Sequence, residues 1–470
     1  MAAPEARPAE FLRSIEVSGW RQFEDVSIAF HDRLTIITGA NGAGKTTLLN
    51  LISPHFGWRV PFATVPEPAR RVIEYATNVW RTITTFGKGP SETPSAVVGK
   101  LAYDEGEASI LVPQTSSEHS YAIEYSERRP LRGLFIPSHR PVFVPTAVHA
   151  PRSPIPVEQA HQRYAEAVRS AWMPGSKPTA SPLQILKEAL LSWLPQGSTY
   201  ALDFERVLAD VLPEWVGFRE LDARDGEIIL MTATGEFTID AVSGGIAALI
   251  DLAWQVFTFA AIAEGRFVVI IDEPENHLHP EMQRSVLYKL TRAFPRAQFI
   301  VASHAPLVVT SVRDAYVYVL SSPSGDGEGH GATGEGATEV LLRPTVVPRA
   351  GATEPARRVV HAARLEGFDR AGTANDVLRN VLGLDYTMPV WAANVLEEAV
   401  AEVARDDYRP EALERFDRRL RENDLETYSV EAMRRLRVSA TIGDVPRMRS
   451  ADIAWADLPE QEPPPSLGAR

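Results

Sequence analysis

The sequence predicts an α/β protein in which a mixed or parallel sheet is flanked by helices. The first observation is a pair of very apolar strands, "FVVII" at 267–271 and "QFIVA" at 298–302, which are typical of central strands covered on both faces. The second is a glycine-rich turn that joins an apolar strand, ending near residue 39, to a helix that begins "KTTLLN". Strands and helices that follow one another in this way build layered α/β domains.

Length and composition limit the classes of protein that remain. The chain has 470 residues, which suggests two or three structural units. Its 61 acidic and 48 basic residues give a net charge of -13, which argues against a protein that coats nucleic acid but not against a local basic face. The chain has no cysteine, which excludes disulfides and thiolate metal sites.

Two segments bear on location. The N-terminus, "MAAPEARPAE", lacks the basic and apolar parts of a secretory signal, so we expect a cytoplasmic protein. The segment 246–263 is apolar enough to resemble a membrane span. It carries Asp251 and Gln255 near its middle, which favours a buried helix of a soluble domain and no membrane partner.

Proline, glycine and apolar periodicity divide the chain in order. Residues 11–40, 97–145 and 226–240 contain patterns typical of strands. Prolines at 151, 154 and 156 mark a boundary, and short helical patterns follow it. We expect a disordered N-terminus at 1–10, a main domain at 11–345 with a helical insertion at about 151–220 and a flexible loop at 321–339, a C-terminal helical domain at 355–455, and a disordered tail at 459–470.

The turn "GANGAGKT" at 39–46 fits the phosphate-loop pattern G-x-x-x-x-G-K-[ST] in its required place between strand and helix. Backbone N–H groups of such a loop curl around phosphate oxygens. Lys45 should reach the β- and γ-phosphates of ATP, and the Thr46 hydroxyl should ligate Mg²⁺. The motif predicts a P-loop NTPase fold, and the alternative is an ordinary glycine-rich turn. The expected nucleotide-binding residues are Asn41, Gly42, Ala43, Gly44, Lys45, Thr46 and Thr47.

Two adjacent carboxylates follow the apolar strand in "FVVIIDEPENHLHP". Burying like charges together is costly unless a cation lies opposite, and the Mg²⁺ that accompanies ATP would supply that cation. We expect Asp272 to hold the metal, and Glu273 to activate the water that attacks the γ-phosphate, with a surface acid as the alternative. His277 and His279, with Glu275 nearby, form only a weak metal-site pattern, and we favour a structural or subunit-contact role.

A second group of residues also suits a phosphate. "AVSGGIAALIDLAW" places Ser243, Gly244 and Gly245 at the start of a helix, where a hydroxyl, exposed N–H groups and the helix dipole come together. Alone, this tripeptide would be a common helix-entry turn. The next strand ends at Ser303 and His304, and His304 either touches the γ-phosphate or is an ordinary structural residue.

The order of these four motifs resembles that of the ABC-type ATPases. Within that class, "GANGAGKTTLLN", "IDEPENHLHP" and "ASHAPLVV" resemble the soluble heads of the SMC, RecF and overcoming-lysogenization-defect proteins. The resemblance implies that 243–245 form a signature motif that completes the ATP site of the opposite subunit. It also implies that 275–280 cross the dimer interface and that His304 is the switch histidine.

Other positions are assigned through the same resemblance. Ile246 follows the signature glycines where these proteins often have a polar residue. Arg140 in "FIPSHRP" stands where these heads often carry an arginine, so it joins the expected nucleotide-binding residues, with Gln114 as the rival for the glutamine loop. Arg21 or Phe23 is a candidate for contact with the nucleotide base.

The C-terminal pattern "TANDVLRNVLGLDYTMPVWAANVLEEAVAEVARDD" resembles the tail of Septu-type ATPases, which belong to bacterial anti-phage systems and work with an HNH nuclease. An amphipathic bundle that caps the main domain would give the same pattern. No acidic cluster of a TOPRIM nuclease follows the ATPase motifs in the sequence, which separates the chain from the overcoming-lysogenization-defect nucleases.

These motifs favour an ATP hydrolase that acts as a switch. ATP and Mg²⁺ would join subunits head to tail in a homodimer or higher homo-oligomer, and hydrolysis would reopen it to control a partner effector such as an HNH nuclease. One alternative is a RecF-like DNA-repair ATPase that binds nucleic acid through Arg128, Arg129, Arg132, Arg434, Arg435 and Arg437. Another, which the insertion and the "HLHP" turn disfavour, is a transporter ATP-binding subunit.

Overall fold

The structure is a computed structural model, and its chain divides into two compact units. Unit 1 comprises Met1–Gly325 and Ala337–Asp385, and unit 2 comprises Asp326–Gly336 and Tyr386–Arg470. The structure describes residues 9–67, 74–80, 84–86, 94–116, 118–172, 180–321, 359–365, 390–406 and 408–423, with 425, 428, 432, 433 and 436. Several predictions lie outside these residues: most of the N-terminal segment, the glycine-rich loop after residue 321, the helix expected at 373–386, the tail, and Arg434, Arg435 and Arg437.

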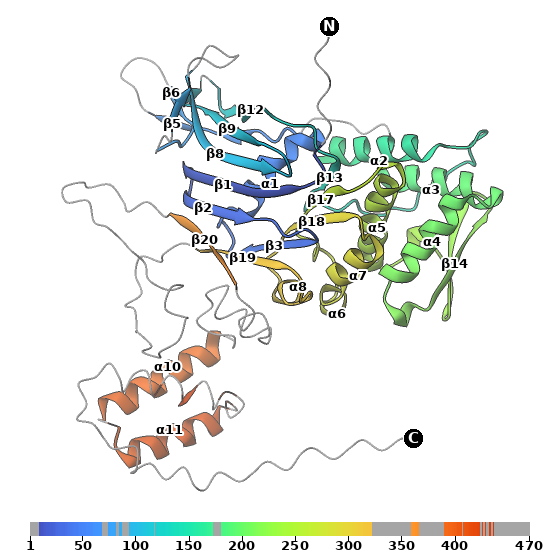
Figure 1. The fold of residues 1–470 in the computed structure, drawn as a ribbon. Coiled ribbons are helices and arrows are strands. Elements are labelled where there is room, and N and C mark those ends of the chain that lie inside the picture. The colour runs from blue at the N-terminus through green and yellow to red at the C-terminus, as the bar shows by residue number, and fades with distance from the viewer. Residues whose placement is uncertain are drawn as a thin grey trace, which may run out of the picture. The chain divides into compact units, whose positions relative to one another are not determined.

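One large mixed sheet forms the centre of unit 1 (Figure 1). Its strands follow the order β12-β9-β8-β1-β2-β20-β19-β3-β18-β17-β13, and β7 also pairs with β8. Their bounds are β1 Leu12–Trp20, β2 Phe23–Ala29, β3 Leu34–Gly39, β7 Thr84–Phe86, β8 Ser95–Tyr103, β9 Glu107–Pro113, β12 Glu124–Ser126, β13 Gly133–Ile136, β17 Phe267–Asp272, β18 Ala297–Ala302, β19 Tyr316–Ser321 and β20 Val360–Arg364.

The parallel half of this sheet contains β19, β3, β18, β17 and β13. Every residue of β3, β17 and β18 is buried, as their continuous apolar sequences predict. β18 lies between the other two, because Val301 pairs with Ile36 on one side and with Ile271 on the other. The carboxyl ends of the three strands therefore meet at one edge of the sheet, where α/β proteins bind ligands.

The other half is built by the antiparallel strands β1, β2, β8, β9 and β12. In β1, Ile15 and Val17 are buried while Glu16 is exposed, the alternation typical of a sheet with one solvated face. Shorter strands lie outside the main sheet: β4 Phe62–Ala63, β5 Val65–Glu67, β6 Glu74–Ala76, β10 Thr115–Ser116 and β11 Ser120–Tyr121.

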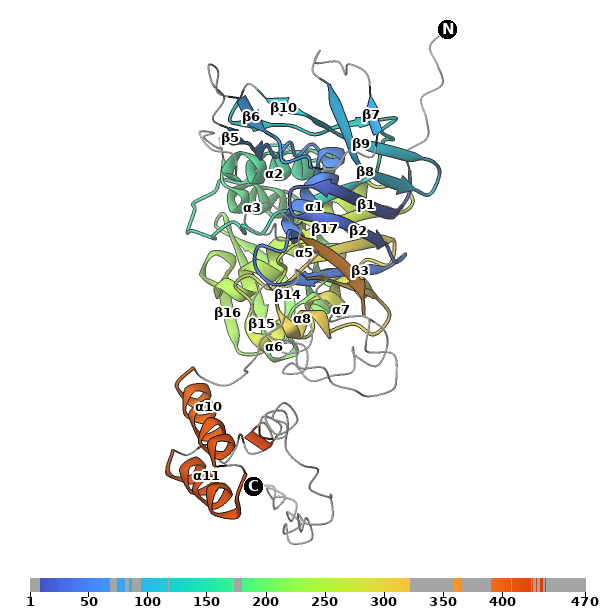
Figure 2. The same cartoon turned by 90° about the vertical axis from the view of Figure 1, so that its left-hand side faces the viewer.

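Helices cover the parallel half. α1 (Lys45–Ile52) contacts β3, β17 and β18, and α5 (Gly244–Ile262) contacts β13. α2 (Val157–Trp172) and α4 (Thr199–Val211) pack against α5, and α3 (Pro182–Trp193) packs against α2 (Figure 1 and Figure 2). The fully buried Trp254 of α5 joins this helical layer, because its ring lies 5.4 Å from that of Trp193 and 5.0 Å from that of Phe204.

The segment expected as a helical insertion thus packs on the core of unit 1. It is followed by a small antiparallel sheet of β14 (Phe218–Arg224), β15 (Glu227–Thr232) and β16 (Gly235–Thr238), and by the short helix η4 (Ile239–Ala241) that leads into α5. The remaining elements of this unit are η1 Ser53–Phe56, η2 Leu194–Gln196, η3 Glu214–Val216, α6 Pro280–Gln283, α7 Val286–Ala293 and α8 Pro306–Val309.

α5 is the one helix in the described part of the chain that is long and apolar enough to cross a membrane, with a mean hydropathy of 1.7. Length and composition alone are weak grounds for a span, because core helices pass the same test. Within the protein 72% of this helix is buried, including Asp251 and Gln255. The prediction of a buried helix is confirmed.

Unit 2 is described mainly by α10 (Val390–Arg405) and α11 (Pro410–Glu422). The two helices pack through an apolar cluster that includes Leu396, Val403 and Phe416. On the outside, Arg419 donates to Glu398 at 2.6 Å and to Glu402 at 2.5 Å. The amphipathic pattern of this segment therefore produces a small helical core of its own.

Candidate functional site

The phosphate loop connects β3 to α1 at the edge where β3, β18 and β17 end. Gly44 has a φ of 99° at the N-cap of α1, a conformation that residues with a Cβ rarely adopt. A Cβ there would also collide with Gln22 and with the ring of Phe23. Phe23 is fully buried and its ring lies against Gly44, and contact of Arg21 or Phe23 with a nucleotide base stays a prediction.

Lys45 lies across its own loop. Its ammonium group donates to the carbonyl oxygens of Gly39 at 2.8 Å and Ala40 at 3.1 Å. Burial lowers the pKa of Lys45, while the carboxylates of Glu273, Asp272 and Glu275 act in the opposite direction. The same three acidic groups therefore face the cation that the sequence assigns to the phosphates.

Asp272 joins the acidic strand to the phosphate loop. The Thr46 hydroxyl lies 3.0 Å and 3.2 Å from the two carboxylate oxygens of Asp272. Burial raises the pKa of Asp272 to about 6; the hydrogen bond from Thr46 opposes the rise, and the charge of Glu273 adds to it. The Thr46 hydroxyl and the buried Asp272 carboxylate are oxygen donors of the kind that Mg²⁺ prefers.

These residues fit a metal that is held jointly by protein and phosphate oxygens. No group of three or more His, Asp or Glu side chains that could hold a metal by itself occurs within the described ranges. His279 instead caps α6, because its Nδ1 accepts from the Glu281 N–H at 3.4 Å. This agrees with a structural role for His279 and leaves Thr46 and Asp272 as the metal candidates.

Glu273 points into the same edge from a strained backbone. Its φ of 49° lies in the left-handed region, and its N–H donates to the Ala302 carbonyl at 2.8 Å. The carboxylate accepts from Asn276 Nδ2 at 3.0 Å and lies 3.4 Å from His304 Nδ1. The Glu273 side chain is 29% exposed, so a water molecule can reach it.

Glu275 is the residue whose place in the site the sequence did not reveal. Only 5% of it is exposed, and its Oε1 accepts from the Ser303 hydroxyl at 2.8 Å and from the His304 N–H at 2.9 Å. Its Oε2 is buried without a hydrogen-bond partner among the described residues. Residues 273–275 and 303–304 follow β17 and β18, which pair in parallel, and this pairing is a property of the fold that the sequence pattern does not give.

Arg140 lies behind the acidic strand end. It is 6% exposed, and its Nη2 donates to the carbonyls of Asp272 at 3.1 Å and Glu273 at 3.2 Å, while Nη1 donates to Pro137. Burial lowers the pKa of Arg140, and the charges of Asp251, Asp272, Glu275 and Glu273 oppose that change. In this structure the guanidinium supports the backbone of the acidic pair, and contact with a nucleotide stays a prediction.

The Ser-Gly-Gly motif forms the N-terminus of α5. Ser243 is the N-cap and its hydroxyl accepts from the Ile246 N–H at 3.5 Å. Ser243 and Gly244 are exposed, and a Cβ on Gly244 would find no described atom within 4 Å. Gly245 is closer to the acidic loop, because a Cβ there would lie 3.2 Å from the His277 carbonyl. The motif thus offers its hydroxyl and N–H groups to solvent.

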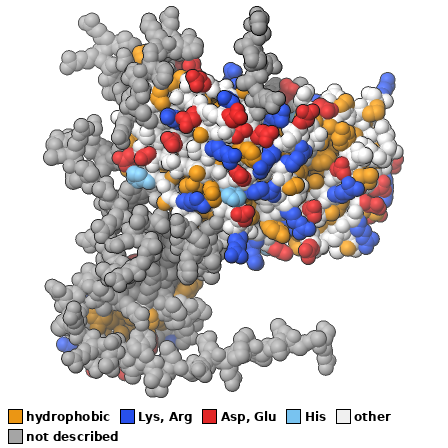
Figure 3. Space-filling view, in the orientation of Figure 1, with side chains coloured by type: hydrophobic (Ala, Val, Ile, Leu, Met, Phe, Trp, Pro, Cys, Tyr) orange, Lys and Arg blue, Asp and Glu red, His pale blue; other side chains and the backbone are white. Residues whose placement is uncertain are grey.

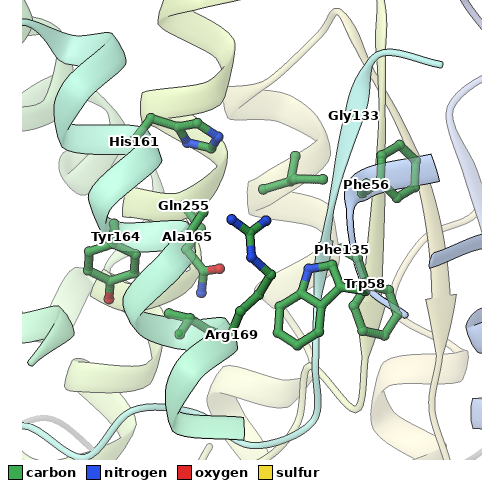
Figure 4. Close-up of a pocket in the computed structure, with 11 residues that line it drawn as sticks. Phe56, Trp58, Gly133, Phe135, His161, Tyr164, Ala165, Arg169 and Gln255 are labelled. Atoms are coloured by element: carbon green, nitrogen blue, oxygen red, sulfur yellow. The ribbon is translucent and has the colours of Figure 1, made fainter. Parts of the chain in front are cut away.

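A cavity of about 60 Å³ lies elsewhere in unit 1, lined by residues of η1, β13, α2 and α5 (Figure 4). Trp58 and Phe135 form an aromatic side, and the guanidinium of Arg169 projects toward His161. Burial lowers the pKa of His161 to about 4, and Arg169 adds to this effect, so the imidazole is neutral near pH 7. None of the phosphate-loop or acidic-strand residues lines this cavity.

Two sequence profiles match the chain at the segments just described. A profile described as an AAA domain matches residues 14–61, which include the phosphate loop. A second, described as AAA domain, putative AbiEii toxin, Type IV TA system, matches residues 202–310, which include 243–245, the acidic pair and His304. Together with the strand order and the loop geometry, they decide the class. The chain has a P-loop NTPase fold.

Relatives of known name resemble parts of this chain. It is 28% identical over 152 residues to the Retron Ec83 probable ATPase of Escherichia coli, covering 30% of this chain and 27% of the relative. It is 37% identical over 86 residues to the Septu protein PtuA of Bacillus mycoides (strain KBAB4), covering 18% of this chain and 11% of that relative. The alignments span 11% to 34% of the curated relatives' own lengths. The predicted resemblance to Septu-type ATPases is confirmed.

The chain also resembles solved structures of other proteins. An SMC head bound to the C-winged helix domain of ScpA is 15% identical to this chain; the match covers 76% of the chain and 97% of the head and has a TM-score of 0.41. At that TM-score the similarity adds nothing to the fold assignment, which rests on strand order and loop geometry.

Proposed function

We propose that the protein is an ATP hydrolase that binds ATP and Mg²⁺ between two subunits and acts as a switch. The observation that carries this proposal is the meeting of Lys45, Asp272, Glu273 and His304 at the edge where β3, β17 and β18 end. Cationic, metal-holding and basic groups are the parts that phosphoryl transfer requires, and a P-loop NTPase fold places them in this way.

Each residue has a task that its surroundings support. Residues 41–47 would surround the phosphates with N–H groups, and Lys45 would turn from its carbonyl partners to the β- and γ-phosphates. Thr46 and Asp272 would hold Mg²⁺, which when bound neutralises charge on the phosphate oxygens. The rise in the pKa of Asp272 supports this assignment, because a cation is what would offset its burial.

Glu273 would act on the attacking water. Asn276 Nδ2 donates to its carboxylate and also to the Ser138 carbonyl at 2.9 Å, so the carboxylate is oriented by a fixed amide. A carboxylate held in this way can orient a water and accept its proton. His304 Nδ1 lies 3.4 Å from Oε1 of Glu273 and 3.4 Å from Oε1 of Glu275. From this position the imidazole would respond to the presence of a γ-phosphate.

The second subunit enters through the signature residues. Ser243, Gly244 and Gly245 stand at the start of a 19-residue helix, and Ser243 and Gly244 are exposed, so the hydroxyl and the first N–H groups can meet a phosphate. We assign them to the ATP site of the partner subunit in a head-to-tail homodimer, which can enter a higher homo-oligomer. ATP then joins the subunits, and hydrolysis separates them.

The names of the relatives support a setting for this switch. Proteins named as a Septu protein and as a retron probable ATPase are similar to the chain. We therefore propose a role in bacterial anti-phage defence, in the cytoplasm, where the dimer controls an effector protein such as an HNH nuclease. The activity of the effector would depend on whether the ATPase is closed or open.

The test uses Glu273→Gln, which keeps the shape of the side chain but removes its basicity. The variant should bind ATP, lose turnover by roughly a hundredfold or more, and sediment as a dimer with ATP and Mg²⁺. The exposed Glu281→Gln is the control and should hydrolyse ATP normally. Normal turnover in Glu273→Gln would remove its role as the base, and monomers in saturating ATP would contradict the dimer.

A RecF-like DNA-repair function is the second candidate, and one observation favours it. Arg33, Arg132, Arg266 and Arg296 donate to main-chain carbonyls, and none of them forms an ion pair with a carboxylate in the described part of the chain. On the face that Figure 3 shows, Lys and Arg side chains gather near the middle of unit 1, with Asp and Glu around them. DNA binding by the chain alone that weakens steeply with salt would favour repair; its absence would favour the effector switch.

A further inference from the structure

Lys187 is a fully buried cation in α3, and the proposed ATP chemistry does not use it. Its side chain has 0% exposure, and its ammonium group has three acceptors: the Thr146 carbonyl at 2.7 Å, Glu227 Oε2 at 2.6 Å and Asp240 Oδ2 at 2.9 Å. Three acceptors use all three ammonium hydrogens. A buried cation is retained only when its hydrogen bonds are complete, and here they are.

The partners of Lys187 come from segments that are far apart in the sequence. Glu227 begins β15, Thr146 lies in the extended segment after Arg140, and Asp240 lies in η4. Asp240 also accepts from the Thr146 N–H at 3.0 Å. Lys187 therefore ties the helical layer to the short stretch of chain that enters α5.

Asp240 is three residues before Ser243. Only 7% of its side chain is exposed, and its Oδ1 is buried without a hydrogen-bond partner among the described residues. The Lys187 ammonium is thus the positive charge that compensates this carboxylate. Further along the chain, a Cβ on Gly244 would contact no described atom within 4 Å, so side-chain packing does not fix the exposed tip of the motif.

We propose that Lys187 is a positioning residue for the signature motif: through Asp240 it sets where Ser243 and the N–H groups after it stand, and so it governs the ATP site of the partner subunit. This inference rests on the proposed head-to-tail dimer. The proposal also assigns a function to the helical segment 157–211, because a movement of α3 would shift the signature motif without moving the phosphate loop of the same chain.

The chain offers a matched pair of substitutions for the test. Asp240→Asn and Glu227→Gln each remove one carboxylate partner of Lys187, but only Asp240 leads directly into the signature. Asp240→Asn should leave ATP affinity of the monomer unchanged and lower both turnover and ATP-driven dimerisation by roughly tenfold or more, the weight of a charged hydrogen bond. Glu227→Gln should change both by less than about threefold. Equal effects of the two substitutions would overturn the proposal in favour of a general stabilising role.

Mixed subunits give the second measurement. Lys187→Met has an intact phosphate loop and Lys45→Ala has an intact signature, so a mixture should regain turnover at one of two sites. Lys187→Met mixed with Ser243→Arg should regain none, because both damage the same half-site. Ser243→Arg mixed with Lys45→Ala is the reference for the dimer itself.

The outcomes separate the two ideas. Recovery in the reference mixture without recovery in the Lys187→Met and Lys45→Ala mixture overturns the role of Lys187 and leaves the dimer standing. No recovery in the reference mixture overturns the trans-acting signature, and the role of Lys187 falls with it. Should Lys187→Met fail to fold, the comparison of Asp240→Asn with Glu227→Gln decides the question.

Discussion

Glu275 accepts a hydrogen bond from the Ser303 hydroxyl at 2.8 Å, and this contact joins the loop after β17 to the end of β18. The same Oε1 also accepts from the His304 N–H at 2.9 Å. Glu275 therefore fixes the backbone from which His304 extends, while His304 itself stays 44% exposed. The loop that follows β17 and the residues that follow β18 therefore form one hydrogen-bonded assembly.

Replacing Glu275 tests this assembly. Glu275→Ala removes the acceptor of two buried donors and should lower the free energy of unfolding by about 1–3 kcal/mol. Turnover should fall as well, because His304 loses its fixed backbone. Urea denaturation and ATPase rates measure the two effects. Glu275→Gln keeps an acceptor oxygen and should retain more stability, and equal stability of Glu275→Ala and the parent would contradict the role of the contact.

Lys45→Ala should abolish ATP binding, since Lys45 is the cation of the phosphate loop and sits among the carboxylates of the site. The expected loss of affinity is at least about a hundredfold, measured by calorimetry with ATP and Mg²⁺. Lys100→Ala is the control, because Lys100 is exposed and forms an ion pair with the exposed Glu107. Unchanged affinity in Lys45→Ala would refute the phosphate-loop assignment.

Asp272 should make stability fall as pH rises. Its pKa of about 6 lies above the ordinary value near 4, so the folded state binds this proton more tightly than the unfolded state does. Between roughly pH 4 and 6 the folded chain holds more protons, and its stability drops as pH rises through that window. Asp272→Asn should remove this loss, which is on the order of 2–3 kcal/mol at pH 7.5 without metal or nucleotide.

Urea denaturation at pH 7.5 and at pH 4.5 measures this effect. The gain of Asp272→Asn over the parent should be large at the higher pH and small at the lower one. The exposed Asp203→Asn serves as control and should show no such difference. If the gain in unfolding free energy were the same at both pH values, burial would not be raising the pKa of Asp272. With ATP and Mg²⁺ present, the parent should be more stable than Asp272→Asn, because a neutral amide at position 272 would hold the metal poorly.

Arg140 is the buried cation that faces four acidic side chains. Arg140→Met should lower the free energy of unfolding by about 3–5 kcal/mol, because it leaves buried carboxylates uncompensated. Arg140→Lys keeps the charge but cannot donate to several carbonyls at once, so we expect an intermediate loss. Arg219→Met, at an exposed position, should be nearly neutral. A nucleotide-contact role alone would instead lower ATP affinity and leave stability intact.

The sequence predicted those parts of the site that local pattern dictates. The phosphate loop depends on glycines at fixed spacing, and the acidic pair follows a strand whose burial on both faces is visible as an apolar run. The order of β3, β18 and β17 in the sheet is a tertiary property, so it was not available from pattern. For that reason the link from Glu275 to Ser303 appeared only in the structure.

Arg140 and Lys187 are two further residues whose contacts could not be predicted from the sequence. Each is a cation within an otherwise ordinary stretch. Arg140 donates to the carbonyl of Asp272, which is 132 residues away in the sequence, and Lys187 donates to Asp240, which is 53 residues away. The Arg140 partners include main-chain carbonyls, which leave no trace in residue types. A helical insertion at about 151–220 was predicted, but its packing on α5 depends on aromatic contacts such as Trp193 with Trp254, which spacing alone does not indicate.

β18 lies between β3 and β17 and so determines how far apart these two strands are. Adjacent strands are about 4.8 Å apart, so the backbones of β3 and β17 are separated by roughly 10 Å. Thr46 lies in the first turn of α1, a helix that contacts all three strands, and its hydroxyl comes within 3.0 Å of Asp272. The distance between the two proposed metal ligands therefore depends on how α1 lies over β18, and a change in sheet twist at that strand would widen or narrow the proposed site without altering either ligand.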